Sequence, residues 1–192
     1  MSLIIGIGHR QLQGKDTLAR FITSEIRENS RGISIETRKF ANKLKEITFS
    51  LYAWAGLERP EYYELHPEKK NEILPKIGKS ARTLWIEYGQ KMREIDAFVW
   101  INPVLLNFSP DILLISDLRF PNEVARIKSL NGFLIKCVYP ERELSNDEAD
   151  IALADFNGWD YIAESNNLSE IHKHASKIVE RFCATYIKRV GR

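Results

Sequence analysis

The sequence predicts a three-layer α/β protein in which helices flank a parallel sheet of about five strands. Short, continuous apolar runs, such as 3–7 and 112–115, are typical of strands buried on both faces of a parallel sheet. These runs alternate with segments whose apolar residues recur at helical spacing, as expected of strands joined by crossover helices. A glycine-bounded loop, residues 8–14, lies between the first run and the first helix, where a parallel sheet binds its ligands.

The first strand leads through this glycine loop into a helix that begins near Lys15. Strand, glycine loop, lysine, hydroxyl residue and helix are the layout of a phosphate-binding P-loop, so the predicted fold is the three-layer P-loop NTPase fold. Backbone N–H groups of such a loop converge on phosphate oxygens, and the positive end of the helix dipole adds to the attraction. Lys15 would bridge the terminal phosphates, and we expect its side chain to face solvent before a nucleotide binds.

The glycine loop departs from the usual pattern in two places. Five residues separate Gly8 from Gly14, where the usual pattern has four. Asp16 stands directly after the lysine, and the hydroxyl residue, Thr17, comes one position later. A strand-to-helix turn that merely contains glycines is the alternative interpretation.

The first half of the chain continues with one strand and several helices. Residues 33–37 alternate between apolar and polar types and predict a short second strand. A helix follows residue 40, and its inner face is predicted to consist of Leu44, Ile47, Leu51 and Trp54. Residues 58–80 are charged and weakly periodic, so we expect a mobile loop or a small lid-like lobe. The next helix, 81–95, is predicted to turn inward Leu84, Trp85, Tyr88 and Met92. Residues 96–106 predict a further helix, interrupted at Asn102-Pro103.

The second half returns to the sheet. The run at 112–115 ends just before Asp117, which is the place of a metal-binding acid at the carboxyl end of a central strand. Asn122 is expected to cap the next helix, and Asn131-Gly132 to terminate it. The segments that follow are predicted as a strand at 133–139, a mobile charged connection at 140–150, a short helix at 152–156 and a strand at 161–163. A long helix, 168–190, ends the chain, and the residues expected to face the sheet are Leu168, Ile171, Ala175, Ile178, Val179 and Phe182.

The composition is that of an ordinary globular protein. The 192 residues are 44% hydrophobic and 28% charged, which fits one domain over residues 1–192 with a buried core. The formal net charge of +2 gives no reason to expect a stable nucleic-acid or membrane partner, and no apolar run is long enough to span a membrane. Cys137 and Cys183 fit no metal spacing, so we expect buried thiols in a reducing cytoplasm. A homodimer is left open.

Four segments carry a resemblance that extends, in the same order, over almost the whole chain. They are the Gly-Lys-Asp-Thr ending of 8–17, a Phe-Ala-Asn-x-Leu-Lys run at 40–45, the Arg, Gly, Arg, Asp and Trp of 82–100, and Asp-Leu-Arg-Phe-Pro-Asn-Glu at 117–123. Together they resemble the deoxynucleoside monophosphate kinases of tailed bacteriophages, relatives of adenylate and dephospho-coenzyme A kinases. A stretch beginning with Asp150-Ile151 fits more loosely. The chain departs from the family pattern at Asn42, Gln90 and Asp147, which bear on base preference and on the lid.

The resemblance implies ATP- and Mg²⁺-dependent phosphoryl transfer to a (deoxy)nucleoside 5′-monophosphate, giving the diphosphate, in the cytoplasm (of the host, if phage-encoded). The residues that would bind the donor are Gly8, Gln13, Gly14, Lys15, Asp16 and Thr17. Those near the metal would be Asp16, Thr17 and Asp117. The acceptor would contact Lys45, Arg82, Arg93, Asp96 and Arg119. The catalytic residues would be Lys15, Asp16, Arg119 and Arg142, of which the two arginines neutralise developing charge.

Simpler explanations exist for several of these side chains. Arg119 could pair with Glu123 four residues later, and Arg93 with Asp96 three residues later. The nearest alternative function is a kinase of the same fold with another small acceptor, such as dephospho-coenzyme A. An alternative of a different class is a nucleotide- or nucleic-acid-binding module without kinase activity, which the basic residues within 188–192 would suit.

Overall fold

A parallel sheet of five strands, in the order β2-β5-β1-β6-β7, forms the middle layer of a three-layer α/β fold, as predicted. The computed structural model describes residues 2–106, 108–141, 148–184 and 186–187. The chain divides into two compact units, of which the first comprises residues 1–39 and 107–192, and the second residues 40–106.

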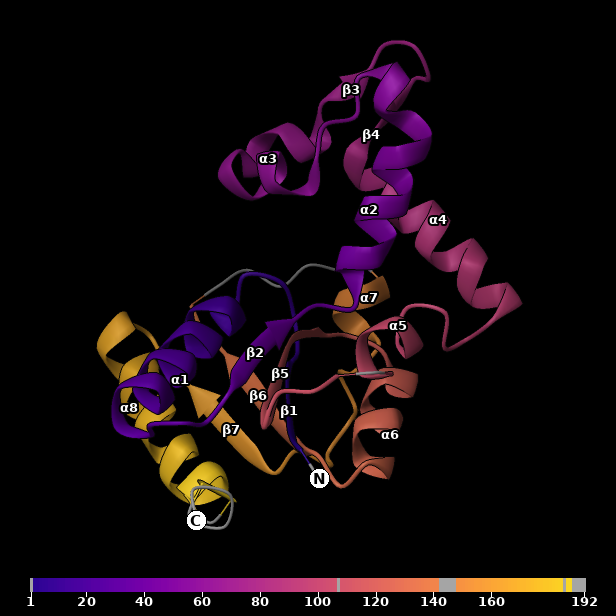
Figure 1. The fold of residues 1–192 in the computed structure, drawn as a ribbon. Helices are drawn as coiled ribbons and strands as arrows, with labels where there is room; N and C mark the ends of the chain where they lie inside the picture. The colour runs from indigo at the N-terminus through magenta and orange to yellow at the C-terminus, as the bar shows by residue number, and fades with distance from the viewer. Residues whose placement is uncertain (1, 107, 142–147, 185, 188–192) are drawn as a thin grey trace. The chain divides into compact units, whose positions relative to one another are not determined.

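The first unit contains the sheet and the helices that flank it (Figure 1). Its strands are β1 (Leu3–Gly8), β2 (Ile35–Arg38), β5 (Ile112–Leu118), β6 (Phe133–Val138) and β7 (Tyr161–Glu164). Its helices are α1 (Lys15–Asn29), α6 (Pro121–Ser129), α7 (Glu148–Ile151) and α8 (Leu168–Ile178), and α8 continues as a π-helical turn, η3 (Val179–Cys183). Because β1 lies between β5 and β6, the glycine loop that follows it opens at the middle of the carboxyl edge of the sheet.

Apolar side chains fill both faces of the sheet. Helices α1 and α8 cover one face, and α6 lies on the other (Figure 1). On α8 the buried residues Ile171, Ala175 and Ile178 recur every three to four positions, so one stripe of the helix meets the sheet. Both cysteines are buried free thiols, as expected. None of the described helices combines the length and the apolar character needed to cross a bilayer.

The turn between α6 and β6 brings Gly132 against the backbone of the central strand. A Cβ atom on Gly132 would lie 2.5 Å from Ile127 Cγ2 and 3.0 Å from the carbonyl oxygen of Ile4. We therefore expect Gly132→Ala to lower the free energy of unfolding by about 1–3 kcal/mol, the range typical of overpacked sites. Urea unfolding of the two proteins measures this difference, and an unchanged midpoint would show that the turn has room for a methyl group.

The second unit is built from helices that pack against one another and from a small antiparallel hairpin. Its helical segments are α2 (Ala41–Tyr52), η1 (Ala53–Ala55), α3 (Pro60–Leu65), η2 (Pro67–Asn71), α4 (Ala81–Ile95) and α5 (Asn102–Leu105). The strands β3 (Ile73–Leu74) and β4 (Lys79–Ser80) pair in the hairpin. A core of Leu57, Tyr63, Ala81 and Leu84 holds these elements together. The region 58–80 is therefore regular structure around a buried tyrosine rather than an irregular loop, and its mobility stays a prediction.

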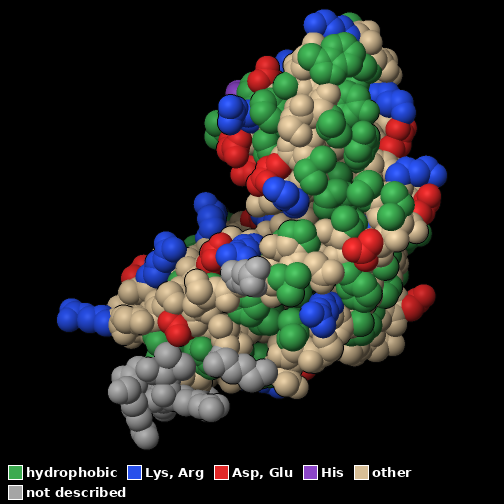
Figure 2. All heavy atoms as spheres, turned by 45° about the vertical axis from the view of Figure 1, so that its right-hand side comes forward, with side chains coloured by type: hydrophobic (Ala, Val, Ile, Leu, Met, Phe, Trp, Pro, Cys, Tyr) green, Lys and Arg blue, Asp and Glu red, His purple; other side chains and the backbone are tan. Residues whose placement is uncertain are grey.

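Several details of the second unit differ from the sequence-based expectation. The inner face of α2 consists of Leu44 and Thr48, whereas Leu51 and Trp54 are 47% and 63% exposed. Residues 97–101 form turns, and Pro103 stands in the first turn of α5, where its missing N–H costs nothing, instead of interrupting a longer helix. Figure 2 shows hydrophobic side chains gathered on the surface of the second unit. The exposed hydrophobic residues of this unit include Trp54.

In the first unit the strands lie where the sequence predicts them, but three local expectations are wrong. Helix α6 begins at Pro121, one residue before the predicted cap Asn122, because the Glu123 carboxylate accepts hydrogen bonds from the N–H groups just before the helix. The short helix is α7, which ends at Ile151, and residues 152–155 form a turn. Leu168, the first residue of α8, is 63% exposed, since the buried stripe starts only at Ile171.

Candidate functional site

The glycine loop between β1 and α1 is a tight structure with three residues in the left-handed region. His9, Leu12 and Gly14 have φ values of 93°, 60° and 82°. Left-handed residues reverse the direction of the backbone, and loops built in this way can present N–H groups to an anion. Gly14 also precedes the first residue of α1, and its carbonyl oxygen accepts the first helical hydrogen bond, from Leu18 N at 2.9 Å. The loop therefore ends at the positive end of a 15-residue helix.

Lys15, the first residue of α1, is buried rather than solvent-facing, which corrects the sequence-based expectation. Its side chain folds back over the glycine loop, where Nζ donates hydrogen bonds to the carbonyl oxygens of His9, at 3.2 Å, and of Arg10. Burial, together with the positive charge of Arg119, lowers the pKa of Lys15 to about 8. The lysine is thus held in place before any ligand binds, and an approaching anion would stabilise its charged form.

The shifted pKa of Lys15 makes stability depend on pH in a testable way. Between pH 8 and pH 10.5, the ordinary lysine value, the unfolded chain binds more protons at this site than the folded chain does. The free energy of unfolding therefore carries a Lys15 penalty at neutral pH that is relieved as pH rises through this window. Between about pH 7.5 and 9.5, the free energy of unfolding of the wild type should rise by on the order of 1–2 kcal/mol relative to that of Lys15→Met. Urea unfolding at both pH values measures the gain, and parallel behaviour of the two proteins would contradict the shift.

Oxygen ligands gather at the start of α1. The exposed carboxylate of Asp16 accepts hydrogen bonds from the Ser116 hydroxyl, at 2.9 Å, and from Lys39 Nζ, at 3.1 Å. Ser116 is therefore a β5 residue that contacts Asp16. The pairing of β1 with β5 is irregular at this point, and Asp117 is the last residue but one of β5, at the carboxyl end of the strand as predicted.

The donor set at this point fits Mg²⁺ that arrives with phosphate oxygens. Mg²⁺ prefers hard oxygen ligands and is usually held by one or two carboxylates together with water and substrate phosphates. Asp16, Thr17 and Ser116 supply a carboxylate and two hydroxyl groups. Among the residues that the structure describes, no group of three or more His, Cys, Asp and Glu side chains comes together to hold a metal on its own.

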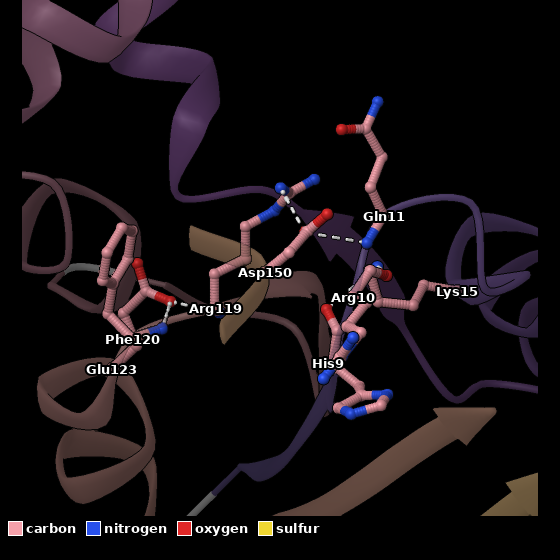
Figure 3. A network of polar contacts seen from close by, with 8 residues as sticks. All are labelled: His9, Arg10, Gln11, Lys15, Arg119, Phe120, Glu123 and Asp150. Atoms are coloured by element: carbon pink, nitrogen blue, oxygen red, sulfur yellow. Dashed lines mark hydrogen bonds and ion pairs between the residues drawn. The ribbon is translucent and has the colours of Figure 1, made fainter. Parts of the chain in front are cut away.

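Arg119 is fixed from two sides beside the glycine loop (Figure 3). The Glu123 carboxylate accepts hydrogen bonds from the backbone N–H groups of Arg119, at 2.7 Å, and Phe120, at 3.1 Å. The guanidinium group pairs instead with Asp150, at 3.1 Å. The side chains of Arg119 and Glu123 therefore do not form the i, i+4 ion pair that was the simpler explanation. Glu123 caps the start of α6 instead, and the Arg119 side chain pairs with Asp150.

Asp150 and Gln13 connect the glycine loop to distant parts of the first unit. The Asp150 carboxylate also accepts a hydrogen bond from Gln11 N, at 2.9 Å. The Gln13 side chain is buried, and its Oε1 accepts a hydrogen bond from Tyr139 N, at the end of β6. His9 Nδ1 lies 3.2 Å from the Cys137 carbonyl oxygen, and burial lowers the His9 pKa to about 4, so this histidine is neutral near pH 7.

Four of the predicted acceptor contacts belong to the second unit. They are Lys45, Arg82, Arg93 and Asp96, and Lys45 Nζ lies 5.4 Å from the centre of the Trp85 ring. Gly8, by contrast, is a packing position, because a Cβ there would lie 2.8 Å from both Leu118 Cβ and Trp159 Cη2.

Arg142, the predicted lid arginine, falls outside the described residues. Sequence spacing did not identify three residues that contact the candidate site. They are Asp150, Ser116 and Lys39. The only signal for Asp150 was its place in the loosely fitting Asp-Ile stretch.

Comparison with known proteins informs the fold only. No protein-family model matches the chain, and no curated protein sequence matches it. Among solved structures, it is similar to the crystal structure of TT1252 from Thermus thermophilus, with 15% sequence identity and a TM-score of 0.50. The similarity covers 93% of this chain and 96% of that chain, so it extends over the three-layer fold as a whole.

Proposed function

We propose that the protein is an ATP-dependent phosphotransferase that phosphorylates a (deoxy)nucleoside 5′-monophosphate to the diphosphate. The observation that carries this proposal is the buried Lys15, held by loop carbonyl oxygens at the start of α1 with the Arg119 guanidinium nearby. Two cations near the positive end of α1 would serve a polyphosphate. The monophosphate acceptor rests on the resemblance of the second-unit segments to the phage kinases.

Phosphoryl transfer requires positioning and charge neutralisation more than covalent chemistry by the protein. The glycine loop and Lys15 would hold the donor phosphates, and Arg119 would face the charge that develops during transfer. Asp16, Thr17 and Ser116 would hold Mg²⁺, which, when bound, neutralises charge on the phosphate oxygens. Lys45, Arg82 and Arg93 would hold the acceptor phosphate, and Arg142 would act as a further lid cation.

The proposal is tested by measuring ADP formation in a coupled assay with a panel of acceptors. The panel contains the ribo- and deoxyribonucleoside monophosphates, dephospho-coenzyme A and single- and double-stranded nucleic acid. We expect turnover with one or more monophosphates and none with the other acceptors. Turnover with dephospho-coenzyme A alone would reassign the acceptor, and ATP binding without any acceptor-dependent ADP formation would favour a non-kinase module.

A further inference from the structure

Asp150 is a buried carboxylate that contacts two parts of the candidate site at once. Its side chain is 1% exposed and lies on α7, immediately beside the glycine loop. One oxygen, Oδ1, accepts both the hydrogen bond from Gln11 N, at 2.9 Å, and that from Arg119 Nη1, at 3.1 Å. Figure 3 shows the carboxylate between the loop backbone and the guanidinium group. A single oxygen thereby fixes the distance between the loop and Arg119.

The backbone and the side chain of Arg119 are held by different carboxylates. Glu123 binds the backbone N–H of Arg119 and the start of α6, and it is itself buried. Removal of the Asp150 charge should therefore leave the backbone of residue 119 in place and release only the guanidinium group. A change at Asp150 should therefore act on the side chain of Arg119 and not on its backbone.

Electrostatics explains why the guanidinium needs a partner here. The positive charge of Arg119 acts against protonation of Lys15, whereas the negative charge of Asp150 favours it. Two cations that will share one polyphosphate repel each other until that ligand arrives. The Asp150 carboxylate, paired with the guanidinium group, offsets part of this repulsion and keeps Arg119 from swinging into solvent.

The second carboxylate oxygen argues against a purely stabilising role. Asp150 Oδ2 is buried and has no hydrogen-bond partner among the described residues. A buried acceptor without a partner is destabilising, and such groups occur at functional sites more readily than in ordinary cores.

We propose that Asp150 is a positioning residue, which holds the Arg119 guanidinium beside the glycine loop in the orientation that phosphoryl transfer requires. The proposal rests on the proposed function and adds to it a residue that acts through Arg119 rather than on the substrate itself. It predicts a loss in kcat and not in the KM for ATP, because the donor would still be bound by the loop and Lys15.

The test is a double-mutant cycle on the full-length protein with the best monophosphate acceptor. Asp150→Asn keeps the shape of the side chain, and Arg119→Met keeps the apolar stem of the arginine. We expect each single variant to lower kcat by about tenfold or more, with the KM for ATP changed less than about twofold. The double variant should be no slower than Arg119→Met alone, within about twofold, because Asn keeps an oxygen that can accept the hydrogen bond from Gln11 N, and the guanidinium on which the carboxylate charge acts is gone. Asp150→Ala is measured alongside and should lose at least as much.

Asp160→Asn is the matched control. Asp160 also pairs with a cation, Lys128 at 2.6 Å, and accepts a backbone N–H, from Leu134 at 2.8 Å, but it lies at the amino-terminal ends of β6 and β7. This variant should keep wild-type kcat even where it lowers stability. Losses that multiply in the double variant, or full kcat in Asp150→Asn, would overturn the positioning role while leaving the kinase proposal intact. A wild type that transfers phosphate to no monophosphate would overturn both.

Discussion

Lys15→Ala is expected to lower kcat/KM by on the order of 10³-fold, the largest effect of any substitution considered for this protein. A cation at a phosphoryl centre contributes several kcal/mol to transition-state stabilisation. The structure is consistent with this expectation, because the carbonyl oxygens of His9 and Arg10 hold Nζ at the glycine loop. Steady-state kinetics with ATP and the accepted monophosphate measure the loss.

The burial of Lys15 makes a second variant necessary. Lys15→Met fills the space of the aliphatic stem, so a loss of activity in this variant reports the charge and not a collapsed loop. Lys128→Met serves as the control, since Lys128 is paired with Asp160 and belongs to no predicted site. If either Lys15 variant keeps more than about a tenth of wild-type activity, the glycine loop does not bind the donor phosphates in the proposed way.

Arg82 should show the second largest effect, a 10- to 150-fold loss in kcat/KM for the monophosphate, as expected for a charge-assisted pair worth roughly 1.5–3 kcal/mol. Arg82 lies in the first turn of α4, which is capped by Ser80, whose hydroxyl accepts a hydrogen bond from Thr83 N at 3.1 Å. Trp85 follows on the same side of the helix, one turn later, and Lys45 lies above its ring. Both predicted acceptor cations, Arg82 and Lys45, therefore lie on helices of the second unit, α4 and α2.

Both Arg82→Ala and Arg82→Lys should raise the KM for the monophosphate and change that for ATP little, because a lysine cannot bind a phosphate through two parallel hydrogen bonds. Lys91→Ala on the same helix is the control, since Lys91 is an exposed residue that pairs with Glu94. A change below about twofold in both arginine variants would identify Arg82 as an ordinary surface residue. Equal losses for ATP and monophosphate would place the acceptor pocket elsewhere.

The sequence was sufficient to predict the bounds of elements whose apolar pattern is regular along their whole length. Helix α4 has the predicted bounds, and the buried runs of β1 and β5 lie side by side in the sheet. Failures occurred where tertiary contacts override periodicity. Leu51 continues the apolar spacing of α2 and yet remains exposed, whereas the polar Thr48 is buried because its hydroxyl donates a hydrogen bond to the Leu44 carbonyl oxygen.

The candidate site shows the same division between local and long-range information. The glycine loop and Lys15 form a contiguous motif, so their positions at the start of α1 could be predicted. Asp150 lies 139 residues from Gln11, and no spacing rule relates residues that meet only through the order of the strands. The burial of Lys15 was not predicted for a related reason. The carbonyl oxygens that accept its hydrogen bonds come within reach of Nζ only when the loop takes its left-handed turns.

The order of the strands has a consequence for how the chain folds during synthesis. β1 leaves the ribosome first, but its neighbours β5 and β6 begin only at Ile112 and Phe133. The second unit, residues 40–106, is contiguous and is completed before either neighbour exists. Domains generally fold as units in the order in which they are made, and non-local strand pairing is slow. We therefore expect the second unit to acquire structure first, while the apolar run Leu3–Ile7 waits unpaired and remains vulnerable to aggregation until the centre of the sheet is complete.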